Sequence, residues 1–194
     1  IENGLKEIRK GARSQRKLAT ADKNKALQLL AKRIVENSES IIEANKIDLK
    51  NLPDDTLVSF RDRLMLDTKR IAQIAEGLVQ VSQLEDPVGE VVEERTLKNG
   101  LKIQRKRAPL GVIFMIFESR PNVILEAFSL AFKSGNSIIL RGGSDSRATS
   151  EVIYKVMAEA LKESQIAWSA FYGIQDYDRV NVELLLTRKD VIDI

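Results

Sequence analysis

The sequence has no cysteine and no histidine among its 194 residues. The chain therefore cannot form a disulfide bond, and it lacks the side chains that bind the metal in common zinc sites. It also lacks the thiol and the imidazole on which Ser-His and Cys-His nucleophile systems depend. We expect no metal site, and no covalent catalysis through sulfur by this chain alone.

Long apolar runs and a large charge of one sign are missing as well. No apolar run approaches the length that spans a bilayer, so no membrane partner is expected. The 31 basic and 28 acidic residues leave a net charge of +3. This small charge does not produce the positive field of a dedicated nucleic-acid binder. Without a signal peptide or disulfides, the chain is predicted to be cytoplasmic and to act on a small molecule.

Helical spacing of apolar residues dominates the first 86 residues. One set follows Thr20, which we predict to be a helix N-cap, and comprises Leu27, Leu30, Ala31 and Ile34. A second set follows Asp67 and comprises Ile71, Ile74, Leu78 and Val81. Pro53 with Asp54 and Asp55 predicts a loop between the two helical blocks.

Residues 87–107 predict a β-hairpin arm. Asn99 and Gly100 stand between two extended runs, and this pair favours a two-residue turn in which both residues have positive φ. The second run carries a basic cluster, Lys102, Arg105, Lys106 and Arg107. Such a cluster fits either a nucleic-acid patch or a solvated strand face. No aromatic residues interleave with the charges for base stacking, which favours the solvated face.

Residues 108–194 alternate between strand and helix patterns. The run GVIFMIF predicts a strand buried on both faces, and SIILR, AWSAFYG and DVIDI predict three further strands. Helical patterns cover residues 123–133, 147–163 and 179–187 between them. This order predicts an α/β fold with a parallel, Rossmann-like sheet and right-handed crossovers.

Ligands of such sheets bind outside the carboxyl ends of the strands. The residues that follow the first strand are Ser119, Arg120, Pro121 and Asn122. Those that follow the second are Arg141, Gly142, Gly143, Ser144 and Asp145. Both loops are therefore candidate binding residues.

Each loop has more than one interpretation. Pro121 suits a helix start, where free N–H groups favour anions. The Gly142–Gly143 pair fits either a phosphate cradle or only a tight turn. Ser144 or Asp145 is a candidate cap for the next helix, and Arg120 is a candidate ion-pair partner for Glu118. The motifs alone indicate a nucleotide-binding α/β domain.

A longer pattern is more specific. RAPLGVIFMIFESRPNV, followed by KSGNSIILRGGSDS, resembles the gamma-glutamyl phosphate reductases, or glutamate-5-semialdehyde dehydrogenases, of the aldehyde dehydrogenase superfamily. IIEANKIDL, DRLMLD, LEDPVGEV and LLLTRKDVIDI resemble family segments in the same order. The resemblance thus covers nearly the whole chain.

The resemblance implies an NADPH-dependent reduction of L-glutamyl 5-phosphate to L-glutamate 5-semialdehyde in proline biosynthesis. Family members form a thioester on a cysteine and reduce it. By position, Arg141 corresponds to the basic residue near the adenosine ribose, followed by Ser144 and Asp145. Residues 119–122 correspond to the loop beside the reaction centre, where donors hold an acyl phosphate or an oxyanion.

The resemblance also implies a division of the chain. Residues 1–86 are expected to be the helical part of the cofactor-binding domain, residues 87–107 an arm that joins a homodimer, and residues 108–194 an incomplete NADP-binding core. The catalytic domain with its cysteine is expected to be absent, leaving the chain alone inactive. Two alternatives are another enzyme of the superfamily, which the ESRPN loop argues against, and a non-catalytic nucleotide-binding or regulatory module.

Overall fold

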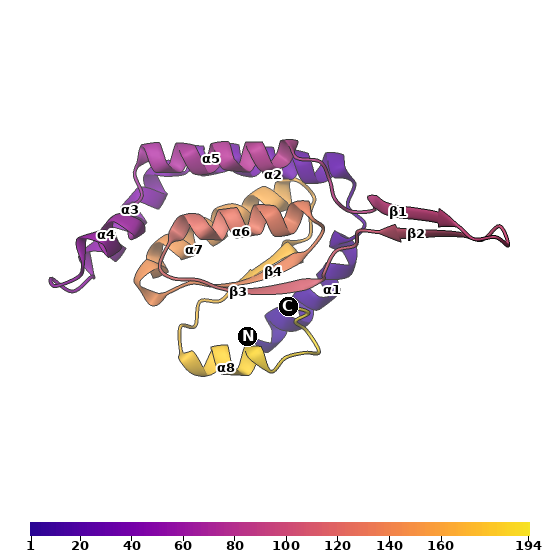
Figure 1. Ribbon diagram of the computed structural model, residues 1–194. Helices are drawn as coiled ribbons and strands as arrows, with labels where there is room; N and C mark the ends of the chain where they lie inside the picture. Colours follow the sequence, from indigo (N-terminus) through magenta and orange to yellow (C-terminus); the bar gives the residue numbers. More distant parts are fainter.

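The computed structural model describes residues 1–194, except for the side chain of Trp168. A parallel sheet lies between two layers of helices, and a two-stranded arm extends from one side (Figure 1). The helices are α1 Glu2–Gln15, α2 Thr20–Glu36, α3 Ser38–Lys50, α4 Val58–Leu64, α5 Thr68–Gln83, α6 Pro121–Lys133, α7 Arg147–Glu163 and α8 Arg179–Leu186. The predicted α/β class with a parallel sheet is confirmed.

The sheet has the order β3-β4-β5, with β3 Val112–Ile116, β4 Ser137–Arg141 and β5 Phe171–Gly173. The predicted fourth strand, DVIDI, is wrong, since residues 190–194 form a turn and an irregular end. Only the last two residues lie against β3: Asp193 N donates to Val112 O at 2.9 Å, and Phe114 N donates to Ile194 O at 2.7 Å. Two paired residues are too few to form a strand.

The two faces of the sheet bury different helices. Helices α6 and α7 cover one face, with α2 and α5 packed outside them, while α1 and α8 lie on the other face (Figure 1). In β4, Ile138 and Leu140 belong to the first core and Ile139 to the second. This alternation follows from the period of two residues in a strand, and it buries β4 on both faces.

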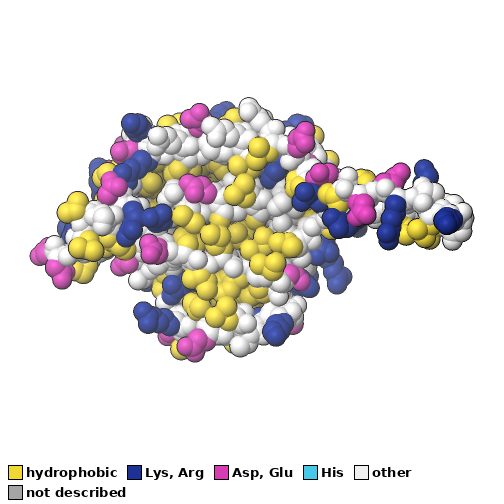
Figure 2. Space-filling model, in the orientation of Figure 1, with side chains coloured by type: hydrophobic (Ala, Val, Ile, Leu, Met, Phe, Trp, Pro, Cys, Tyr) yellow, Lys and Arg dark blue, Asp and Glu magenta, His cyan; other side chains and the backbone are white. Residues whose placement is uncertain are grey.

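Strand β3 differs from its prediction. Val112 is fully buried, but the exposed fractions of Met115 and Ile116 are 36% and 46%. The prediction of a strand buried on both faces is wrong because β3 lies at the edge of the sheet and its second half is uncovered in the described chain. Figure 2 shows apolar side chains gathered on this part of the surface.

The polar side chains at the starts of α5 and α2 play different roles. Asp67 caps α5, since its Oδ1 accepts from Arg70 N at 2.7 Å. Thr20 is not a cap: Ala19 precedes α2, and the Thr20 hydroxyl donates to Asp86 Oδ2 at 2.8 Å. A tertiary hydrogen bond has taken the side chain that the local pattern assigned to the helix start.

Asp86 also belongs to a buried ionic cluster at the base of the arm. The Lys23 ammonium is 1% exposed, pairs with the Asp86 carboxylate, and donates to Lys133 O at 3.0 Å. Burial by itself would raise the pKa of Asp86. Hydrogen bonds from Lys23, Val88 and Thr20 outweigh burial and hold the pKa below its usual value. The cluster therefore connects α2, α6 and the segment that leads into the arm.

The arm consists of the antiparallel strands β1 Val91–Thr96 and β2 Lys102–Lys106 (Figure 1). Leu97 N donates to Leu101 O at 2.9 Å, so the loop has three residues, 98–100, and Gly100 alone among them has positive φ. The predicted two-residue turn is wrong; a three-residue loop with a left-handed glycine formed instead. The basic side chains of β2 are exposed, and Arg105 pairs with Glu93 at 3.7 Å, as expected of a solvated face. Among the described helices, none is both long and apolar enough to cross a membrane.

Candidate functional site

The two predicted loops meet at the carboxyl ends of β3 and β4. Phe117 N donates to Arg141 O at 3.1 Å, which continues the strand pairing beyond β3. Ser119 Oγ then donates to Asp145 Oδ2 at 3.1 Å. The structure thus brings Ser119 together with the loop that follows Arg141.

Gly142 and Gly143 make this contact between the loops possible. A Cβ on Gly143 would lie 2.1 Å from Ser119 Oγ and 3.1 Å from Ser119 N, and one on Gly142 would lie 3.0 Å from the Phe117 ring. Neither glycine has positive φ. Both residues therefore need to be small because the neighbouring loop is close, which favours the tight-turn interpretation over a phosphate cradle.

The cap of α7 comes from a distant residue. Asp48, on α3, accepts from Ala148 N at 2.9 Å, from Thr149 N at 2.8 Å and from the Thr149 hydroxyl at 2.6 Å. Its exposed fraction is 4%. The prediction that Ser144 or Asp145 caps this helix is wrong: Ser144 begins a short 3₁₀ turn, and Asp145 is hydrogen-bonded to Ser119.

This cap also changes what the end of α7 can bind. Free N–H groups and the helix dipole favour an anion at a helix N-terminus. At α7 the Asp48 carboxylate already takes this position. A phosphate would have to be held by other groups at this edge of the sheet. Nothing near Ser144 in the sequence signals this cap, because Asp48 lies 100 residues before Ala148.

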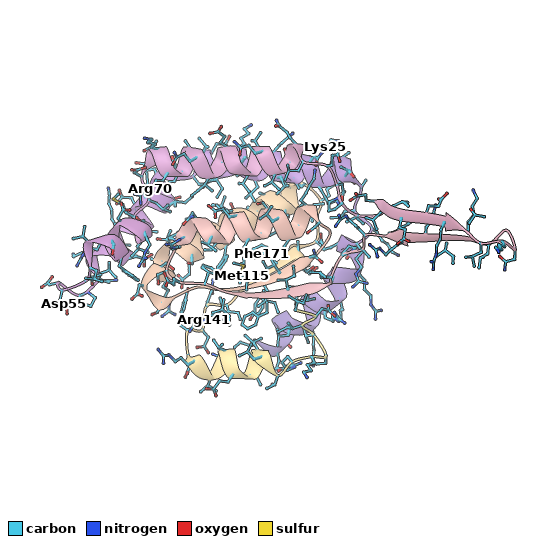
Figure 3. The ribbon with its side chains drawn as sticks, viewed as in Figure 1. Lys25, Asp55, Arg70, Met115, Arg141 and Phe171 are labelled. Carbon is cyan, nitrogen blue, oxygen red and sulfur yellow. The ribbon has the colours of Figure 1, made fainter. Side chains whose placement is uncertain are left out.

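The side chain of Arg141, which Figure 3 labels, contacts Tyr177. Its Nη2 donates to Tyr177 O at 2.8 Å, and its Cζ lies 6.0 Å from the centre of the Tyr177 ring. The Cζ of Arg147 lies 5.6 Å from the same ring. Tyr177 is thus near two guanidinium groups, an arrangement that stabilises the charges through the ring face. Sequence reasoning missed Tyr177, since no local pattern marks it.

Two further properties of this group bear on ligand binding. Burial raises the pKa of the Tyr177 hydroxyl, although a hydrogen bond with Ser150 partly opposes it, so the ring is neutral near pH 7. Arg141 Nε is buried and has no hydrogen-bond partner among the described residues. A buried N–H without a partner is costly, and an anion that reached it would remove that cost.

Arg120 and Asn122 do not join the contact between the two loops but line a separate groove. Pro121 occupies the first position of α6, as predicted. From there Arg120 and Asn122 line a groove of about 670 Å³ between α5 and α6. The side chain of Arg120 makes no ion pair with Glu118 in the described chain; the contact between the two residues is Arg120 N donating to Glu118 O at 2.7 Å. Within this loop, Ser119 therefore contacts the loop that follows β4, whereas Arg120 and Asn122 line the groove between α5 and α6.

Comparison with known sequences identifies relatives of this chain. The chain is 46% identical over 192 residues to a gamma-glutamyl phosphate reductase of Lachnospira eligens, a match that covers 98% of this chain and 46% of the relative. The similarity is to gamma-glutamyl phosphate reductases. The predicted resemblance is confirmed, and the chain spans about half the length of the relatives it matches. No family model matches.

Solved structures agree. The gamma-glutamyl phosphate reductase of Thermotoga maritima superposes with a TM-score of 0.95 at 38% identity, covering 98% of this chain and 46% of that one. The gamma-glutamyl phosphate reductase of Saccharomyces cerevisiae superposes with a TM-score of 0.89 at 30% identity, covering 98% of this chain and 49% of that one. A probable aldehyde dehydrogenase of Listeria monocytogenes superposes with a TM-score of 0.75 at 12% identity, covering 98% of this chain and 39% of that one. The predicted aldehyde dehydrogenase-like fold is confirmed.

Proposed function

We propose that this chain is the cofactor-binding part of an NADPH-dependent gamma-glutamyl phosphate reductase. The reaction reduces L-glutamyl 5-phosphate to L-glutamate 5-semialdehyde and releases phosphate, in proline biosynthesis. The observation that carries the proposal is the 46% identity, over 98% of this chain, to a protein of that name. The absence of cysteine from these residues leads us to expect no turnover by them alone.

The cofactor supplies a hydride, and the residues at the carboxyl end of β4 would hold its adenosine half. Arg141 would take the 2′-phosphate, which is supported by its buried Nε that lacks a partner. Ser144 and Asp145 follow in the loop that Ser119 holds in place. Gly142 and Gly143 would serve by keeping the two loops together, in keeping with the short distances to Phe117 and Ser119.

The loop after β3 would serve the substrate. Ser119 lies against the cofactor loop, while Arg120 and Asn122 open into the groove between α5 and α6. Pro121 starts α6 directly after Arg120. An acyl phosphate held by Arg120 would thus lie at the edge of the sheet where the cofactor binds.

In the full-length enzyme, Arg141→Ala is expected to weaken NADPH binding about ten- to a hundredfold and NADH binding much less. A guanidinium contact to a phosphate contributes about 1.5–3 kcal/mol, and only NADPH carries the 2′-phosphate. Asp145 lies nearby and would oppose the phosphate, so the wild-type preference for NADPH should be moderate. Titration calorimetry with both cofactors measures the two losses.

The matched control is Arg13→Ala, which removes an exposed guanidinium from α1. It should leave both affinities unchanged. Equal losses of NADPH and NADH binding in Arg141→Ala would mean that Arg141 supports the fold or the common part of the cofactor. In that case the proposed NADPH selectivity would be wrong.

A non-catalytic nucleotide-binding module is the second candidate, and the absence of cysteine favours it only if no cysteine-bearing domain follows these residues. Its gene would end without a cysteine-bearing domain, whereas the reductase requires an open reading frame that continues into one. The homodimer, the cytoplasmic location and the division at residues 86 and 107 stay predictions.

A further inference from the structure

The groove between α5 and α6 has the size of a small-molecule site. Its volume of about 670 Å³ lies within the range of roughly 300–1,000 Å³ typical of ligand pockets. Leu66, Leu78 and Leu125 form an apolar wall, and their exposed fractions are 6%, 2% and 1%. Arg120, in the loop between β3 and α6, is one of the residues that line the groove.

One pair of charges in this groove is already neutralised. Arg70 Nη2 contacts Asp62 Oδ1 at 2.6 Å, and Arg70 Nη1 donates to Met65 O at 2.9 Å. These contacts fix Arg70 at the junction of α4 and α5 (Figure 3). Arg70 therefore stabilises the wall of the groove and has little capacity left for a ligand.

Three other charged groups remain. Arg63 and Arg120 line the groove, and neither forms an ion pair within the described chain. Arg63 lies over the Phe60 ring, with its Cζ 6.0 Å from the ring centre. Glu126 is held by Asn122, whose Nδ2 donates to Glu126 Oε1 at 2.9 Å from one helical turn away. The groove thus offers two guanidinium groups and one oriented carboxylate.

This set of charges matches an amino acid that carries a second anionic group. An α-carboxylate and a phosphate each suit a guanidinium, and an α-ammonium suits a carboxylate. We propose that Arg63 binds the α-carboxylate of L-glutamyl 5-phosphate and Glu126 its α-ammonium, with Arg120 at the phosphate end. The inference rests on the proposed function, and it assigns substrate specificity to Arg63 and Glu126.

The test uses three probes that differ by one group each. L-2-amino-5-phosphonopentanoate keeps all three charged groups, 5-phosphonopentanoate lacks the ammonium, and 4-aminobutylphosphonate lacks the carboxylate. Glu126→Gln should weaken binding of the first probe about tenfold or more and leave 5-phosphonopentanoate nearly unchanged. Glutamine retains an oxygen that can accept from Asn122, so the local fold should persist.

Arg63→Gln should weaken the binding of L-2-amino-5-phosphonopentanoate and of 5-phosphonopentanoate by a similar factor. It should leave the binding of 4-aminobutylphosphonate unchanged. Glu159→Gln and Arg13→Gln, both on exposed positions outside the groove, are the matched controls and should change nothing. Chemical-shift titration of the full-length protein measures all affinities, including weak ones.

NADPH is titrated into the same samples. If NADPH binds but the complete probe does not, or if each variant loses affinity equally for all probes, the assignment of Arg63 and Glu126 is overturned. If NADPH itself fails to bind, it is the proposed function that is overturned. The two failures are therefore distinguishable.

Discussion

Asp48→Ala is expected to lower the free energy of unfolding by about 3–5 kcal/mol, because the variant leaves buried N–H donors of α7 without an acceptor. The Asp48 carboxylate accepts three hydrogen bonds from Ala148 and Thr149, at 2.6–2.9 Å, and joins α3 to α7 across the edge of the sheet. Urea unfolding followed by circular dichroism measures the loss.

Asp55→Ala is the matched control, since Asp55 lies in an exposed loop (Figure 3). It should change the stability by no more than about 0.5 kcal/mol. Asp48→Asn keeps one oxygen acceptor and should fall between the two. A loss in Asp48→Ala no larger than that of Asp55→Ala would show that the cap contributes nothing to the fold.

In the full-length protein, deletion of residues 95–105 is expected to convert a homodimer into a monomer. All of β1 is exposed, and Leu97 and Leu101 near the tip are 40% and 55% exposed. The two strands pair only with each other, so each leaves an open edge. Pairing of such an edge with another subunit would remove the unpaired backbone groups. Light scattering measures the mass in solution.

The body of the protein should survive this deletion, because the arm lies outside both cores. Unchanged circular dichroism would establish that. Lys98→Ser, within the loop of the arm, is the control and should remain a dimer. A wild-type monomer, or a deletion variant that stays dimeric, would mean that the arm is not the contact between subunits.

Local patterns predicted the helices well, for a physical reason. The spacing of Ile71, Ile74 and Leu78 reflects one buried face, and this face is decided within a few turns of chain. The cap at Asp67 is equally local. Thr20 and β3 show the limit: the partner of Thr20 is 66 residues away, and the burial of Met115 depends on whether a neighbour covers the edge of the sheet.

The place of the two loops in the fold could be predicted from the sequence, but their contacts could not. Parallel topology places the ends of β3 and β4 at one edge, and Ser119 does meet Asp145 there. The sequence could not tell that Arg141 turns to Tyr177, or that Arg120 opens into the groove. Those directions depend on how loops distant in sequence pack against each other.

The central claim is that the carboxyl ends of β3 and β4 bind NADPH. The most direct measurement is a titration of the isotope-labelled full-length protein with NADPH, followed through the backbone amide signals. NADPH should produce the largest shifts at the amides of Ser119, Arg141, Ser144, Asp145 and Tyr177. No shift at these amides, or shifts confined to the arm or to the groove between α5 and α6, would contradict it.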